Sequence, residues 1–117
     1  MFDTILARIV QLSGGRGAAL ISVDGLAIDA VDENGRSVAP DEATRDYASV
    51  LKQLSSAGEA MEVGDVGEVT LEGLEETTVV RVVTPTYFVA LRLPREVPVG
   101  RGRFQLRVAA PDLVREL

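Results

Sequence analysis

The stretch TTVVRVVTPTYFVALRL, Thr77–Leu93, decides the fold. Its two halves are rich in β-branched and aromatic residues, which favour strands, and the dipeptide Pro85-Thr86 between them favours a turn. Both halves are apolar on both faces apart from Arg81 and Arg92, so each strand should be covered on both sides. The stretch therefore predicts a central β-hairpin with a layer of other structure on each face.

A further strand pattern precedes this hairpin. Between Glu68 and Leu74, the apolar residues Val69 and Leu71 alternate with polar ones, which is typical of a half-exposed strand at a sheet edge. Nearer the N-terminus, two short apolar runs flank the dipeptide Asp24-Gly25, which favours a type I′ turn. A first hairpin is therefore expected, with its strands at Ala18–Val23 and Leu26–Val31.

Three segments show helical periodicity. Apolar residues recur every three or four positions from Phe2 to Leu12, and a second run extends from about Asp41 to Met61. A third helix is expected in the C-terminal segment, bent or restarted at Pro111. This order of elements predicts an α/β (α+β) fold, a three-layer α/β/α sandwich with a five-stranded antiparallel sheet, which residues 1–117 fill as a single domain.

The second helix carries two adjacent stripes. One stripe is apolar throughout, and the other consists mostly of small side chains, which let another surface come close. A solvated face would carry more Lys, Glu or Arg, so the small stripe is a candidate contact surface. The alternative is that Ser and Ala are merely tolerated at these positions. The apolar stripe is Ala43, Tyr47, Val50, Leu54, Ala57 and Met61, and the small stripe is Thr44, Ala48, Leu51, Ser55 and Gly58.

The composition excludes most catalytic machinery. The chain contains no cysteine and no histidine, which removes thiol nucleophiles, the commonest general base and the commonest metal ligand. The glycine-rich segment Ser13–Leu20 lacks the Gly-Lys-Ser/Thr ending of a phosphate loop and leads into a strand. Arg81 and Arg92 are expected to form structural ion pairs or to reach solvent. We therefore predict no catalytic residue, no cofactor and no metal, and a protein that is not an enzyme.

Charge is unevenly distributed along the chain. The formal net charge is -6, with 15 acidic and 5 basic residues up to Glu76 and 3 acidic and 7 basic residues after it. The basic stretch VPVGRGRFQLR, Val97–Arg107, lies in the second part, but a net negative field repels polyanions, so nucleic-acid binding is not expected. We place its glycines in the loop before the third helix, expect Phe104, Leu106 and Val108 to pack against the sheet, and interpret its arginines as solvated.

The N-terminal residues MFDTILARIVQLSGG carry no basic leader. Their apolar run is interrupted by Asp3 and Arg8, which is typical of neither a signal peptide nor a membrane span. We expect a cytoplasmic protein without membrane insertion.

Nearly the whole chain resembles one family. The segments DYASVLKQLSSAGEAMEVGDVGEVTL, TTVVRVVTPTYFVALRLP and GRGRFQLRVAAPDLVREL resemble bacterial stand-alone members of the Roadblock (dynein light chain) family, related to the Mgl-type regulators of Ras-like GTPases. The hairpin ALISVDGLAIDA resembles the first strand pair of that family. The most specific part of the likeness is the aromatic start of the last strand, followed by the glycine, arginine and phenylalanine residues that enter the third helix.

The resemblance implies a Roadblock/profilin-like homodimer in which the second helix and the third strand meet their two-fold mates. It also implies a non-enzymatic regulator or scaffold that binds a small Ras-like GTPase on the paired second helices, in cell polarity or motility, with a GTPase-activating role as one form of that function. The dimer interface carried over by position is Ala48, Leu51, Ser55, Gly58, Val69 and Leu71, and the GTPase-binding set is Thr44, Ala48, Ser55 and Gly58.

Activation by such a member would order the switch residues of the GTPase itself. An inserted arginine finger is the alternative, and its candidates are Arg36 and Arg45. Two other functions stay open at this point. One is a scaffold that pairs with another Roadblock protein, and the other is a PAS-like small-molecule sensor, which would need an internal pocket.

Overall fold

The hairpin expected at Thr77–Leu93 lies inside the sheet, with a strand on either side of it. The structure is a computed structural model that describes residues 2–117, so Met1, the first residue of the predicted domain, lies outside it. Five strands form one antiparallel sheet in the order β2-β1-β5-β4-β3. In chain order the elements are α1 (Phe2–Ser13), β1 (Gly17–Ser22), β2 (Ala27–Val31), α2 (Ala43–Ala60), β3 (Glu68–Glu72), β4 (Glu76–Val82), β5 (Tyr87–Pro94) and α3 (Val99–Glu116).

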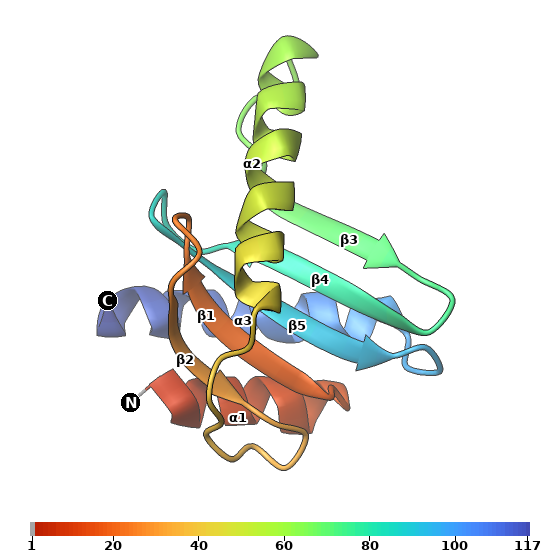
Figure 1. Ribbon diagram of the computed structural model, residues 1–117. Coiled ribbons are helices and arrows are strands. Elements are labelled where there is room, and N and C mark those ends of the chain that lie inside the picture. Colours follow the sequence, from red (N-terminus) through yellow and green to blue (C-terminus); the bar gives the residue numbers. More distant parts are fainter. Residues whose placement is uncertain (1) are drawn as a thin grey trace.

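Helices cover both faces of the sheet, which confirms the predicted three layers. Figure 1 shows α2 on one face and α1 and α3 on the other. Because successive side chains of a strand point to opposite faces, Val79 packs with α1 and α3 whereas its neighbour Val80 packs with α2. The α1/α3 side holds the larger core, and the α2 side holds a smaller one built around Phe88.

Both arginines of the central strands form ion pairs, which is one of the two outcomes expected for them. Arg81 of β4 lies opposite Glu68 of β3 in the strand register, and its Nη1 is 3.3 Å from the carboxylate. Arg92 of β5 donates hydrogen bonds of 2.9, 3.2 and 3.0 Å to Glu76. The two arginines point to opposite faces of the sheet, and each reaches a carboxylate, which lowers the cost of placing a cation on an inner strand.

The first hairpin forms, but its turn differs from the prediction. A type I′ turn needs positive φ at both central residues, whereas Glu62 is the one non-glycine residue with positive φ in the described part of the chain. The turn instead closes with the Gly25 amide donating to the Ser22 carbonyl at 2.9 Å, and Gly25 takes φ +93°. Glycine is therefore needed at this turn, and Asp24 is not in the left-handed conformation.

Helix α3 begins earlier than its sequence suggests. We expected Gly100 and Gly102 in a loop, but the helix starts at Val99 and continues through Pro111 to Glu116. Gly102 is buried, and a Cβ atom there would lie 2.7 Å from Leu93 Cδ1 and 3.0 Å from Leu91 Cδ2. Close packing on the sheet, rather than helix propensity, explains this glycine.

The orientation of α3 corrects a second expectation. Leu106 is buried in the core as predicted, but Phe104 and Val108 are exposed. The buried side of the helix is instead Gly102, Leu106, Ala109 and Leu113.

We predict opposite effects of alanine at the two glycines of α3. Gly102→Ala should destabilise the fold by about 1–3 kcal/mol, because its methyl group would press on Leu91 and Leu93. Gly100→Ala should be neutral or stabilising by up to about 1 kcal/mol, because nothing lies within 4 Å of its Cβ position. Urea unfolding measures both, and equal stabilities for the two variants would contradict the packing argument.

Candidate functional site

Helix α2 packs on its own chain through the stripe of small side chains. Ala48 and Leu51 are buried against the sheet, and the Thr44 hydroxyl donates to the Gly25 carbonyl at 3.2 Å. At the other end of the helix, a Cβ at Gly58 would lie 3.2 Å from the Gly64 carbonyl oxygen. The small stripe therefore serves intramolecular packing, and four residues that we expected to contact partners are buried in the single chain: Thr44, Ala48, Leu51 and Gly58.

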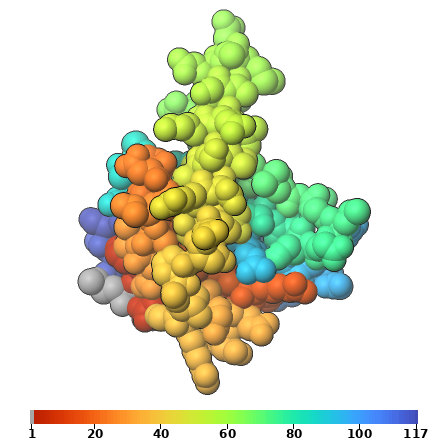
Figure 2. All heavy atoms as spheres, viewed as in Figure 1, coloured from red at the N-terminus to blue at the C-terminus, as the bar shows by residue number. Residues whose placement is uncertain are grey.

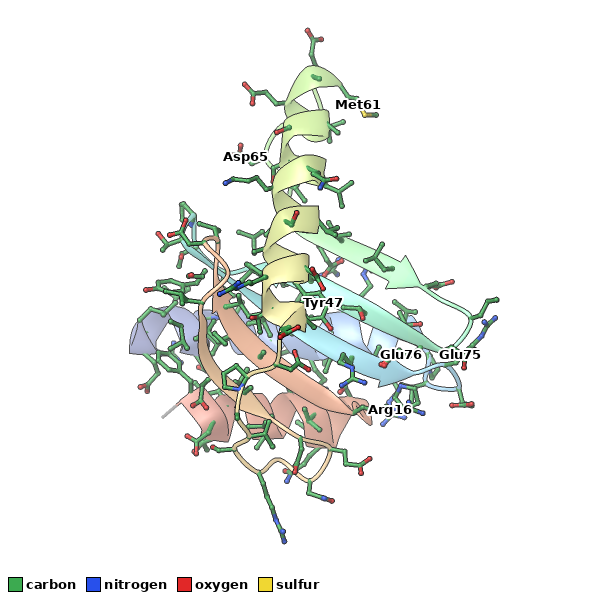
Figure 3. All side chains as sticks on the ribbon, viewed as in Figure 1. Arg16, Tyr47, Met61, Asp65, Glu75 and Glu76 are labelled. Carbon is green, nitrogen blue, oxygen red and sulfur yellow. The ribbon has the colours of Figure 1, made fainter. Side chains whose placement is uncertain are left out.

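Most of the apolar stripe of α2 consequently lies at the surface, and Tyr47 is the member that packs partly buried against the core. A buried small stripe fixes the rotation of the helix, so the adjacent stripe, about a quarter-turn away, lies at the surface on the side of β3. Figure 3 shows Tyr47 near the sheet and Met61 at the projecting end of the helix. The exposed fractions are 36% for Val50, 37% for Leu54 and 72% for Met61.

The apolar stripe and β3 together line one hollow. Val69 and Leu71, which the family resemblance assigned to the dimer interface, lie in it beside Tyr47, Val50 and Leu54. Leu71 is 46% exposed. Every side chain that lines the hollow is apolar or aromatic, so this surface is suited to covering by another apolar surface. We call it the α2/β3 face, defined by Tyr47, Val50, Leu54, Met61, Val69 and Leu71.

The two edges of the sheet differ in how they are protected. Beyond β2, the following loop covers the edge: the Val38 amide donates to the Ala30 carbonyl at 3.0 Å, and Val31 bridges Ser37. Within the part of the chain that the structure describes, β3 pairs with β4 alone. The outer edge of β3 therefore stays available for strand pairing, directly beside the apolar stripe.

A groove of about 980 Å³ lies on another flank of α2. Ser55, one of the predicted GTPase contacts, lines it together with Lys52 and Glu59, and the β1–β2 turn contributes Asp24. The groove is open at the surface, unlike the internal pocket that a small-molecule sensor needs. Figure 2 shows the C-terminal part of α2 as a ridge that stands clear of the body of the molecule.

The two arginine-finger candidates lie in different places. Arg45 is an exposed residue of α2, with its Cα 3.4 Å from the position that a Cβ of Gly25 would take. Arg36 is exposed in the loop after β2, next to Gly35, whose Cβ position is close to Ala7 of α1. Arg45 is thus the candidate on the α2 side of the molecule.

A polar cluster lies under the N-terminal part of α2. Burial raises the pKa of the Tyr47 hydroxyl. The nearby Arg92 and a hydrogen bond with Thr78 lower this pKa and so act against the effect of burial. The hydrogen bonds from Arg92 hold the pKa of the Glu76 carboxyl below its ordinary 4.5. The cluster supports the base of the α2/β3 face, because Tyr47 belongs to both.

Residues 2–117 offer neither a metal site nor a membrane-spanning helix. Among these residues, no three acidic side chains gather closely enough to hold a metal ion. In the same part of the chain, none of the helices combines the length and the apolar character needed to cross a membrane.

The exposed position of the apolar stripe is what sequence reasoning missed. Helical periodicity groups residues into stripes but does not say which stripe meets the core. One signal was present: the small stripe contains Gly58 and Ala48, which permit a closer approach than the bulky stripe does.

Comparison with known proteins identifies the family. No model of a protein family matches the chain, and no curated protein does. Among solved structures, a Roadblock/LC7 domain from Streptomyces avermitilis gives a TM-score of 0.85 at 20% identity, over 97% of this chain and 95% of that one. MglC from Myxococcus xanthus is 34% identical over 99% of this chain and 98% of that one, with a TM-score of 0.71. The chain belongs to the Roadblock family.

A third structure shows the same fold at lower identity. MglB from Myxococcus xanthus gives a TM-score of 0.86 at 11% identity, over 97% of this chain and 91% of that one. The likeness to MglC supports a regulator or scaffold role for this Roadblock chain.

The Glu76–Arg92 pair predicts a pH-dependent contribution to stability. A carboxyl with a lowered pKa in the folded state stabilises the fold above the unfolded pKa, near 4.5, and this contribution is lost as the pH falls through the folded pKa. Glu76→Gln should therefore be less stable than the natural chain at pH 7, and the difference should shrink below about pH 4.5.

Urea unfolding between pH 7 and pH 3 measures this difference. Arg92→Leu removes the partner and should show the same convergence with the natural chain at low pH. A stability difference for Glu76→Gln that stays constant over the whole range would contradict the assignment.

Proposed function

We propose that this Roadblock protein is a homodimeric, non-enzymatic regulator or scaffold that binds a small Ras-like GTPase. The observation that carries the proposal is the α2/β3 face: an exposed apolar helix stripe beside the unprotected edge of β3. The family membership supports the same role.

Self-association follows from the geometry of that face. A two-fold axis beside β3 would pair the two edge strands and bring the apolar stripes of both α2 helices together, because a C2 interface uses the same patch twice. Such pairing would give hydrogen-bond partners to the backbone N–H and C=O groups on the outer edge of β3. It would also remove Val50, Leu54 and Leu71 from water. The end of α2 that carries Met61 projects past its own sheet, where it can contact a second copy (Figure 3).

The GTPase is assigned to the open groove beside Ser55. Ser55, Lys52 and Glu59 line this groove and do not line the apolar hollow, so we expect the groove to stay accessible when the α2/β3 face is covered. Its walls mix apolar side chains with Lys52, Glu59 and Asp65, a combination suited to a protein partner. Binding there would act on the switch segments of the GTPase by contact and needs no catalytic group from this chain.

The α2/β3 face also fits a homologous Roadblock chain, which is the second candidate partner. An apolar stripe and an open strand edge do not distinguish an identical copy from a related one. The mass of the protein in solution, alone and mixed with a candidate paralogue, separates the two.

Charge placed on the apolar stripe should abolish the dimer. Val50→Asp with Leu54→Asp should weaken self-association at least about 100-fold, because two carboxylates would be buried without partners. Both side chains are exposed in the single chain, so circular dichroism should show an unchanged fold. Gln53→Asp, an exposed position of the same helix outside the stripe, is the control.

Sedimentation at micromolar concentration reads out the mass of each variant. A natural chain that stays monomeric would exclude the homodimer. A double variant that remains dimeric would place the interface elsewhere.

A bulky residue in the groove should block the GTPase and leave the dimer intact. Ser55→Trp should weaken binding to a Ras-like GTPase at least tenfold, because Ser55 lines the groove and is exposed. Gln53→Trp is the control. A panel of purified bacterial Ras-like GTPases, loaded with GTP or GDP, should be tested for column retention and for hydrolysis rate.

Each result of that panel has a distinct meaning. Faster hydrolysis identifies an activator, and retention without acceleration identifies a scaffold. If no GTPase is retained by the natural dimer, the GTPase part of the proposal is wrong.

A further inference from the structure

The face of the molecule opposite α2 carries a second apolar surface that the proposed function does not use. On α3, Phe104 and Val108 are 61% and 51% exposed, and Leu12 at the end of α1 is 53% exposed. The α1 and α3 helices both lie behind the sheet in Figure 1, away from α2. We call Leu12, Arg101, Phe104, Arg107 and Val108 the α3 patch.

Contacts between α1 and α3 bring these residues together. Arg101 Nη2 donates to the Leu12 carbonyl at 3.4 Å, and at the other end of the pair Arg8 Nη2 is 2.6 Å from the Asp112 carboxylate. The two helices thus run antiparallel, with Leu12 beside the first turn of α3. Positions three and four apart share one side of a helix, so Arg101, Phe104, Arg107 and Val108 form a continuous outer ridge.

The ridge carries more positive charge than the carboxylates near it can neutralise. Glu68 faces Arg81 at 3.3 Å and Arg103 at 2.6 Å, and Arg107 is 4.0 Å from the same carboxylate oxygen that Arg103 binds. The Arg107 side chain is 56% exposed, whereas that of Glu68 is 13% exposed and is already occupied. Among the described residues, Arg101 pairs with no carboxylate, and its side chain donates to the Leu12 carbonyl. This part of an acidic protein therefore has a local positive excess.

We propose that the α3 patch is a docking surface for an acidic, amphipathic segment of a partner protein. Arg101 and Arg107 would bind carboxylates, for which the guanidinium fork is suited, and Phe104 and Val108 would contact an apolar side chain between those carboxylates. Aromatic residues and arginine are enriched at protein interfaces.

The same observations disfavour a nucleic acid or a membrane. The net charge of the chain is -6, and it doubles in a homodimer, so an extended polyanion or an anionic bilayer would be repelled by the rest of the surface. A short acidic segment contacts only the positive patch. The exposed apolar side chains of Phe104 and Val108 also favour a peptide, because they can contact an apolar side chain but give a phosphate group no favourable contact.

The patch is separate from the α2/β3 face and from the groove beside Ser55. The sheet lies between α3 and α2, and their cores share no residue. A homodimer with a GTPase bound would therefore still present this surface. The inference goes beyond the proposed function because it assigns a second partner to the other side of the molecule.

Selection from a random-peptide display library against the natural protein tests the proposal. The enriched peptides should combine Asp or Glu with an aromatic or aliphatic residue, and their affinity should fall as salt is added. Binding should weaken at least tenfold in Arg101→Glu with Arg107→Glu, and likewise in Phe104→Ser. Circular dichroism and solution mass should match the natural protein, because the three side chains lie outside the core.

The matched control is Arg36→Glu with Arg45→Glu, which makes the same change of charge at exposed sites elsewhere and should bind the peptides normally. Enriched peptides without acidic residues, no enrichment at all, or acidic peptides that bind the patch variants unchanged would each overturn the proposal. Phosphatidylserine vesicles and duplex DNA are tested in parallel. Suppose that vesicles or DNA bind the natural protein but not the patch variants, and that no peptide depends on the patch. This result would assign the surface to lipid or nucleic acid instead.

Discussion

Ala48 and Leu51 hold helix α2 against the sheet, while Thr44 and Gly58 connect its two ends to the β1–β2 turn and to the segment after the helix. This packing sets the rotation of α2. A Cβ atom at Gly58 would lie 3.2 Å from the Gly64 carbonyl oxygen, so a larger side chain there would require a shift of the segment after the helix. Once the small side is buried, the apolar stripe has to lie beside β3. The α2/β3 face is a consequence of how one helix meets its own sheet.

The sheet separates two surfaces with different chemistry. The α2 side offers apolar side chains and an unprotected strand edge, which suit a second Roadblock chain. The α1/α3 side offers arginines around two exposed apolar residues, which suit an acidic segment. Glu68 links the sides, because it belongs to the edge strand β3 and also holds Arg103 of α3. A scaffold needs separate surfaces of this kind, since one partner must not displace another.

Much of the fold could be predicted from the sequence. Runs of β-branched residues around Pro85-Thr86 indicated the inner hairpin, and the alternation around Val69 and Leu71 indicated an edge strand. These features are local, because the side-chain period and turn chemistry depend on neighbouring residues. The arginines on the central strands were predicted to form ion pairs or to reach solvent, since an unpaired buried cation is costly there, and both form ion pairs.

The sequence by itself determined the order of elements, the layers and the edge position of β3. The tertiary structure alone decided which stripe of α2 is buried, where α3 begins, and that Phe104 and Val108 face outward. Gly102 is the clearest case. Glycine disfavours a helix, yet Gly102 lies inside α3. It is needed there because Leu91 and Leu93, which lie several positions away in sequence, leave no room for a Cβ atom. Rotation of a helix about its axis depends on the shape of the surface beneath it, and that surface exists only after the sheet has formed.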